Sequence, residues 1–141
     1  MMAGKADFTE DEWNNLHRGA TGAGMMVALS ERGFSSTFKE SGALAKFMAH
    51  ASTSSTSQLV RELAATHGSG WKVSSSMEEV ETGTVAALKD AVATLQNKAN
   101  ADLADYRTFV VEVAQAVAGA AKGGDVEEAA AIETIKAAMA D

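Results

Sequence analysis

The sequence is punctuated by helix-start signals, and it contains no proline to interrupt the helices that follow them. Each signal is a Ser, Thr or Asp followed three residues later by Glu or Gln. Both side chains of such a pair accept hydrogen bonds from backbone amides that a helix start leaves unpaired. Five such starts occur, at Thr9, Thr37, Ser55, Ser76 and Asp125. The chain is therefore expected to fold mainly as helices.

The first helix is the most clearly marked. Phe8 precedes the capping residue Thr9, acidic residues occupy the positive end of the helix, and Trp13 begins an apolar stripe. The stripe continues through Leu16, Ala20, Ala23 and Val27. We predict a helix from about Glu10 to Arg32, ended by Gly33, with Trp13 largely buried.

Two shorter helices are predicted next. The second helix starts at Thr37 and runs toward His50, and the third is opened by residues 55–58 and ended by Gly68. The hydroxyl-rich run 52–57 is predicted to be a loop between them, because Ser and Thr side chains compete with the hydrogen bonds of a helix.

The C-terminal half is predicted to hold three more helices. Residues 76–79 cap the first of these, and Gly83 is expected to break or bend its first turn. If that helix simply continued, Asp102 would lie on its apolar face, so a turn near residues 97–100 and a new helix are predicted instead. Gly123-Gly124 ends the new helix. The last helix begins at Asp125 and presents Ile132, Ile135 and Met139.

No segment alternates polar and apolar residues as a strand does, and the β-branched residues recur at helical spacing. Many connections are short, which favours antiparallel neighbours. A chain of 141 residues is long enough to bury one core. We predict a single all-α domain over residues 1–141, a compact bundle of roughly five or six helices with mostly antiparallel neighbours. Residues 1–7 are expected to be flexible.

The formal net charge of −7 opposes binding to a phosphate backbone, and no local basic patch offsets it. Cysteine is absent, which fits a reducing compartment. The longest apolar run is Met25–Leu29, and the start of the chain lacks the apolar stretch of a secretory signal. These features predict an acidic cytoplasmic protein that neither binds nucleic acid nor spans a membrane.

The stretch Gly19–Gly24 has the glycine content of a nucleotide-binding loop, in which glycines let the backbone approach phosphates. Such a loop follows a buried strand, whereas this stretch follows a capped helix start. Close packing of the helix against its neighbours, or a bend in the helix, explains the glycines better.

The chain offers no set of residues typical of a catalytic or metal site. The histidines are His17, His50 and His67, and no Glu-x-x-His pair of the di-iron bundle type occurs. They are predicted to lie at the surface or at helix caps. Paired acids such as Glu78 and Glu79 are typical of helix starts, and no serine lies in a nucleophile elbow. We predict no enzyme activity, no cofactor and no metal.

Trp71 lies in a predicted loop beside Lys72. A loop tryptophan either closes the end of a bundle, which is the commoner role, or contacts a partner. Met25, Met26 and Met48 either fill the core or, being flexible, line an adaptable binding groove. We predict a non-enzymatic protein-interaction or assembly module, with Trp71 and Lys72 as partner-binding residues and a protein or a second copy as partner. The alternative is a small-molecule or lipid-binding helical bundle.

Short motifs spread along nearly the whole chain resemble those of a known protein family. They are Phe8-Thr9 with Glu12-Trp13, Lys39-Glu40, Leu59-Val60, Tyr106-Arg107-Thr108-Phe109, Gly123-Gly124, and the ending Glu128, Ile132, Ile135 and Met139. This set resembles a family of small all-helical bacterial proteins of unknown function, which implies a helical fold and supplies no activity. The ending is also similar to TerB-type helical domains of tellurite resistance. It lacks their Asp-rich surroundings, so no metal binding is implied.

Overall fold

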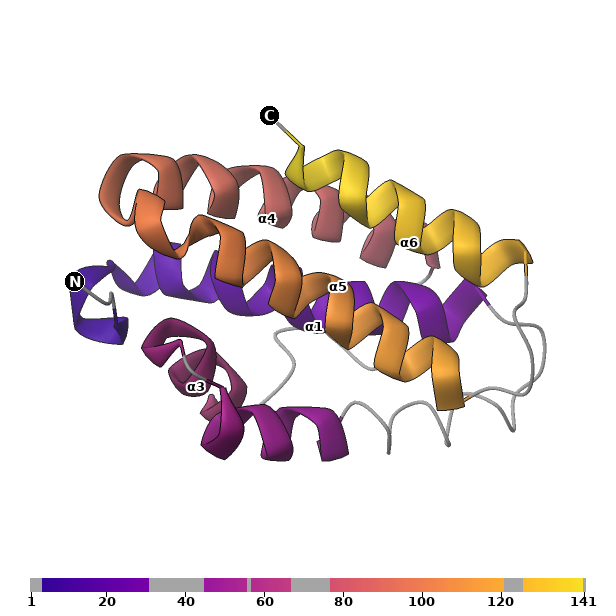
Figure 1. Cartoon of the computed structure of the whole chain (residues 1–141). Coiled ribbons are helices and arrows are strands. Elements are labelled where there is room, and N and C mark those ends of the chain that lie inside the picture. The colour runs from indigo at the N-terminus through magenta and orange to yellow at the C-terminus, as the bar shows by residue number, and fades with distance from the viewer. Residues whose placement is uncertain (1–3, 31–44, 56, 67–76, 121–125, 141) are drawn as a thin grey trace.

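The computed structural model describes residues 4–30, 45–55, 57–66, 77–120 and 126–140. Within these ranges every element is a helix, which confirms the predicted all-α bundle (Figure 1). The elements are η1 (Lys5–Asp7), α1 (Glu10–Ser30), the helical residues 45–54, α3 (Gln58–Ala65), α4 (Met77–Lys98), η2 (Asn100–Asp102), α5 (Leu103–Ala120) and α6 (Val126–Met139). None of the described helices combines the length and the apolar character needed to cross a membrane.

Helix α1 is the central element of the bundle and packs against α4, α5 and α6. Residues 19–24 are all buried. Because a helix with a single apolar face would expose some of six consecutive residues, neighbours must cover α1 on all sides here. The direction of the chain alternates from α4 to α5 and from α5 to α6, and α5 runs in the same direction as α1 (Figure 1).

The start of α1 is fixed by the residues that predicted it. The Thr9 amide donates to Glu12 Oε1 (2.9 Å), and the Glu12 amide donates to Thr9 Oγ1 (3.2 Å). The rings of Phe8 and Trp13 pack with their centroids 6.0 Å apart, across the first turn. Two orphan amides are thereby satisfied and the entering chain is held in place. The prediction that α1 begins at Glu10 is confirmed.

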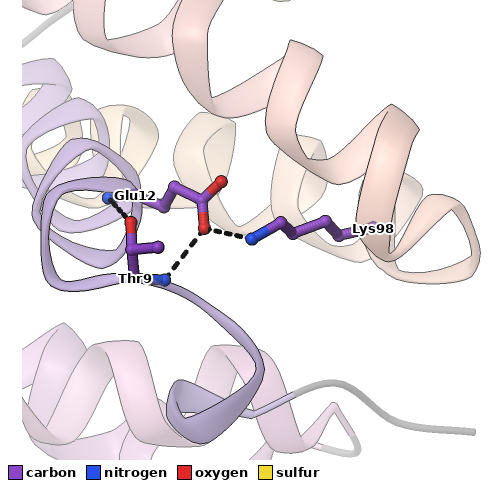
Figure 2. A network of polar contacts seen from close by, with 3 residues as sticks. All are labelled: Thr9, Glu12 and Lys98. Carbon is purple, nitrogen blue, oxygen red and sulfur yellow. Dashed lines mark hydrogen bonds and ion pairs between the residues drawn. The ribbon is translucent and has the colours of Figure 1, made fainter.

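The same carboxylate joins the start of α1 to the end of α4. Lys98 Nζ lies 2.5 Å from Glu12 Oε1, the oxygen that also accepts the Thr9 amide (Figure 2). The hydrogen bond from Lys98 and then the one from the Thr9 amide lower the pKa of Glu12 below its ordinary value of 4.5. Lys98 also stands in the last turn of α4, where a cation is favoured by the helix dipole.

The buried apolar residues form one continuous core that includes side chains from all the described α-helices. Trp13 is only 3% exposed, so its predicted burial is confirmed. The rest of the predicted α1 stripe is also buried, as are five apolar residues that recur at helical spacing along α5. These are Leu16, Ala20, Ala23, Val27, Leu103, Tyr106, Val110, Val113 and Val117.

The loop predicted over residues 52–57 is wrong for its first half. Residues 52–54 continue the preceding helix beyond His50. Their hydroxyls do not compete with it, because Ser52 Oγ donates to the Ala49 carbonyl (2.7 Å) and Thr53 Oγ1 to the His50 carbonyl (3.2 Å). The N-cap of α3 is Ser57, whose Oγ accepts from an amide in the first turn of the helix, so the start at residue 55 was placed two residues too early.

One further expectation is corrected: Gly83 does not interrupt α4, which is continuous from Met77 to Lys98. Residues 4–7 form η1 and its N-cap, and the Lys5 amide donates to Glu62 Oε2 of α3 (3.1 Å). The predicted turn before α5 is confirmed as Ala99 and η2, although Asp102 is buried there. The predicted stops at Gly33, Gly68 and Gly123-Gly124 and the caps at residues 37, 76 and 125 lie outside the described residues.

Candidate functional site

The predicted partner-binding residues Trp71 and Lys72 lie outside the described residues. The described surface presents two other recesses, one between α5 and α6 and one along the first half of α1. The two differ in chemistry, because the first has an apolar bed and the second is lined by polar residues.

The α5–α6 groove has a volume of about 480 Å³ and is open to solvent. Val111, half-buried, and Met139, buried, supply its apolar bed. The exposed rim residues are Thr108, Glu112, Gln115, Lys136 and Ala140, and Arg107 completes the lining. Such a combination of an apolar bed with a polar rim is the anatomy of a protein interface.

Helix α5 can line this groove because its two faces differ. Its buried side packs in the core, while the groove residues 107, 108, 111, 112 and 115 recur at helical spacing on the other side. They span about 12 Å at 1.5 Å per residue, or roughly two turns. The sequence signal for this groove is Val111, an apolar residue outside the buried stripe of α5. Reasoning from periodicity did not identify it.

Arg107 fastens the two walls of the groove together. Its Nε donates to the Met139 carbonyl at the end of α6 (2.9 Å), where helix carbonyls are left without amide partners. Lys136 lies 3.7 Å from Glu133, in an exposed pair of the kind that contributes little to stability. With Glu112 on the opposite wall, the rim carries charges of both signs.

The recess along α1 has a volume of about 540 Å³ and is lined by Asp11, Asn14, Asn15, His17 and Arg18. His17 was predicted at the surface or at a cap, and this is wrong, since it is only 6% exposed. Burial lowers the pKa of His17 below its ordinary value of 6.5, and a hydrogen bond to the backbone of Thr66 partly opposes that effect. His50 is exposed as predicted, and His67 lies outside the described residues.

The glycine-rich stretch is a packed part of α1 rather than a nucleotide loop. Tyr106, fully buried on α5, donates its hydroxyl to the Leu16 carbonyl (2.7 Å), and burial raises the pKa of Tyr106. A Cβ built on Gly19 would lie 2.8 Å from that hydroxyl oxygen and 2.8 Å from Leu88 Cδ2. Gly19 therefore allows α5 and α4 to approach α1 closely, as the packing interpretation predicted.

The remaining predicted candidates fall into the core. Met26 is buried, and Met25 and Met48 are half-buried against the core cluster, so they act as core filler. Among the residues with described positions, no three His, Asp or Glu side chains gather closely enough to hold a metal ion.

Comparisons of this chain with protein-family models, with curated proteins and with solved structures give no match.

Proposed function

We propose that this chain is a non-enzymatic protein-interaction module that binds an amphipathic helix of a partner protein in the α5–α6 groove. The observation that carries this proposal is the open groove between two antiparallel helices, whose apolar bed is formed by half-buried Val111 and buried Met139. A helix laid into such a groove would bury its apolar face against the bed, which is an established mode of peptide recognition.

The dimensions and charges of the groove support a helical occupant. Its lining on α5 extends over about two turns, which matches the spacing of anchor residues at i, i+3 or i+4, and i+7. The rim charges Arg107, Glu112 and Lys136 have both signs, so they favour an occupant with acidic and basic residues flanking its apolar face. We further propose a bacterial cytoplasmic setting, on the resemblance noted above and the absence of cysteine.

A second candidate function is the binding of a small apolar molecule in the same groove. The volume of about 480 Å³ falls in the range of roughly 300–1,000 Å³ typical of ligand pockets, and a flexible side chain, Met139, is among the lining residues. The groove is open, however, whereas ligand pockets enclose most of the ligand surface. The open geometry thus favours a protein segment as the occupant, because such a segment can itself cover the open side of the groove.

Site-specific photo-crosslinking in the native host tests the proposal. A photoreactive residue at the rim position Thr108 should give a defined crosslink to an amphipathic helical segment of a partner protein. The same residue at exposed Ala93 on α4, outside the groove, is the matched control. Val111→Glu should abolish the Thr108 crosslink, while Ala93→Glu, which adds the same charge elsewhere, should preserve it.

A synthetic peptide with the crosslinked sequence then allows the interface to be mapped by NMR. The proposal requires chemical-shift changes centred on Val111 and Met139 and helical structure in the bound peptide. Equal crosslinking from positions 108 and 93, or a crosslinked segment without an apolar helical face, would contradict it. Saturable binding of an apolar fluorescent dye that Val111→Glu removes, without any crosslinked partner, would favour the small-molecule alternative.

A further inference from the structure

The two walls of the α5–α6 groove are held in register by Arg107. Its Nε donates to the Met139 carbonyl (2.9 Å), so residue 107 of α5 and residue 139 of α6 lie at about the same level along the groove. Because the direction of the chain alternates between these helices, the residues that follow 107 on α5 lie across from those that precede 139 on α6 (Figure 1). This register places the rim residues of one wall relative to those of the other.

Glu112 and Lys136 stand across from each other in this register, one on each wall. Glu112 lies five residues after Arg107, and Lys136 lies three residues before Met139. At 1.5 Å per residue these offsets are about 7.5 Å and about 4.5 Å, so the two residues differ in level by only about 3 Å. Both residues are exposed, and the Lys136 side chain is 48% accessible. At the level of Val111 the groove therefore has an acidic rim on α5 and a basic rim on α6.

The neighbouring charges leave this difference between the walls in place. Arg107 reaches from α5 to the Met139 carbonyl on α6, so its charge lies at one end of the groove and is shared by both walls. Lys136 pairs with Glu133 of its own helix at 3.7 Å, and an exposed pair of this kind contributes little. Among the described residues, Glu133 is not part of the groove lining, so Lys136 is the charge that an occupant meets on the α6 side.

We propose that Glu112 and Lys136 determine the direction in which a partner helix lies in the groove. The partner carries basic residues along one flank of its apolar stripe and acidic residues along the other. The basic flank faces Glu112, and the acidic flank faces Lys136. Turning such a helix end for end, with its stripe still against Val111, exchanges the two flanks and brings like charges together, which disfavours the reverse direction. This inference rests on the proposed function, since it concerns the helix bound in the same groove.

The preference for one direction follows from the strength of exposed charge pairs. One such pair changes an affinity by up to about fivefold. Reversing the helix replaces two attractive pairs by two like-charge contacts, which are unfavourable by similar amounts. We therefore expect one direction to be preferred on the order of tenfold. Salt screens exposed charges, so the preference should disappear in about 1 M salt, while the contact with the apolar bed persists.

Two synthetic amphipathic peptides of equal composition test the direction. Their leucine spacing reads the same from either end, and the lysine and glutamate flanks of one peptide are exchanged in the other. Each peptide carries a nitroxide label at its N-terminus, which broadens nearby amide signals in NMR spectra of the full chain. The two peptides should lie in opposite directions. One should therefore broaden Gln115 more than Thr108, which stand at the two ends of the α5 wall, and the other should do the reverse.

A charge exchange in the protein supplies the second measurement. The double variant Glu112→Lys with Lys136→Glu keeps the net charge and should reverse the direction of each peptide. The matched control, Lys89→Glu with Asp90→Lys, exchanges two exposed charges of α4 outside the groove and should reverse neither.

The outcomes separate this inference from the proposed function. The inference is overturned if both peptides bind in the same direction, if neither direction is preferred, or if the Glu112 and Lys136 exchange has no effect. In these cases chemical-shift changes at Val111 and Met139 would still support binding of a helix in the groove. Absence of such changes with both peptides would contradict the proposed function, and this inference with it.

Discussion

The contact between Gly19 and Tyr106 gives the sharpest energetic prediction. In an open part of a helix, Gly→Ala stabilises by about 1 kcal/mol through helix propensity. Here the new Cβ would lie 2.8 Å from the Tyr106 hydroxyl oxygen and from Leu88 Cδ2, closer than real Cβ contacts allow. The leucine methyl can move, whereas the tyrosine is fully buried and bonded to Leu16. Overpacking of this kind costs about 1–3 kcal/mol, so we expect a net loss of about 1 kcal/mol.

A double-mutant cycle identifies the cause of that loss. Tyr106→Phe alone should cost about 0.5–1.5 kcal/mol, the value of one hydrogen bond, and it removes the oxygen that a Cβ at position 19 would meet. In the Tyr106→Phe background, Gly19→Ala should therefore be neutral or stabilising, which gives a coupling energy of about 1 kcal/mol or more. Urea unfolding followed by circular dichroism measures all four variants, and Gly83→Ala in α4 supplies the reference for propensity. If Gly19→Ala changes the free energy of unfolding equally in both backgrounds, the close-approach argument is refuted.

Three other substitutions test the core and the α1–α4 connection. Trp13→Ala should cost about 3–5 kcal/mol in urea unfolding, because it empties a buried site and removes the donor to Thr66; a loss below about 1 kcal/mol would contradict its role in the core. Thr84→Val should stabilise by about 1 kcal/mol, since the Thr84 hydroxyl is buried and has no hydrogen-bond partner among the described residues; destabilisation would indicate a partner for it. Because the pKa of Glu12 is lowered in the folded state, its ion pair contributes to the free energy of unfolding above pH 4.5, and this contribution is lost as the pH falls further. Lys98→Met should therefore make the acid-induced loss of stability smaller. An unchanged dependence of the free energy of unfolding on pH would contradict this.

The start of α1 could be predicted because every interaction that defines it is local. Thr9, Glu12, Phe8 and Trp13 lie within five residues of one another, so their types and spacing already specify the capping hydrogen bonds and the ring contact. The apolar stripe of α1 could be predicted equally well, because the helical spacing of its apolar residues indicates by itself which side chains are buried.

The helical residues 52–54 show where local reasoning failed. Hydroxyl side chains favour a loop when nothing else holds the segment. Here the helix is anchored by packing: Ala51 is buried, and the ring of Phe47 stacks on Phe109 of α5 with centroids 6.1 Å apart. Phe109 lies far along the chain, so this contact could not be anticipated from the residues around position 52. The packing of Ala51 and Phe47 outweighs the local preference of the hydroxyl side chains for a loop.

His17 was misplaced for the same reason. It stands four residues after Trp13, on the face that packs toward the end of α3, yet histidine is fully buried less often than apolar residues are. Its partner Thr66 is remote in the sequence, and only the folded chain shows that one residue receives both side chains. The sequence contained one signal for the burial of His17, namely its helical spacing from Trp13, which was itself predicted to be buried.

The position of the groove follows from two neighbouring residues of α5 that bond to different helices. Tyr106 points inward and donates to the Leu16 carbonyl of α1, while Arg107 points outward and donates to the Met139 carbonyl of α6. One turn of α5 is thus tied to both neighbours, which fixes its rotation about its own axis. That rotation decides which residues face outward between α5 and α6, and it places Val111 one turn further along on the groove side. The small Gly19 that admits Tyr106 is therefore also what allows the groove to form where it does.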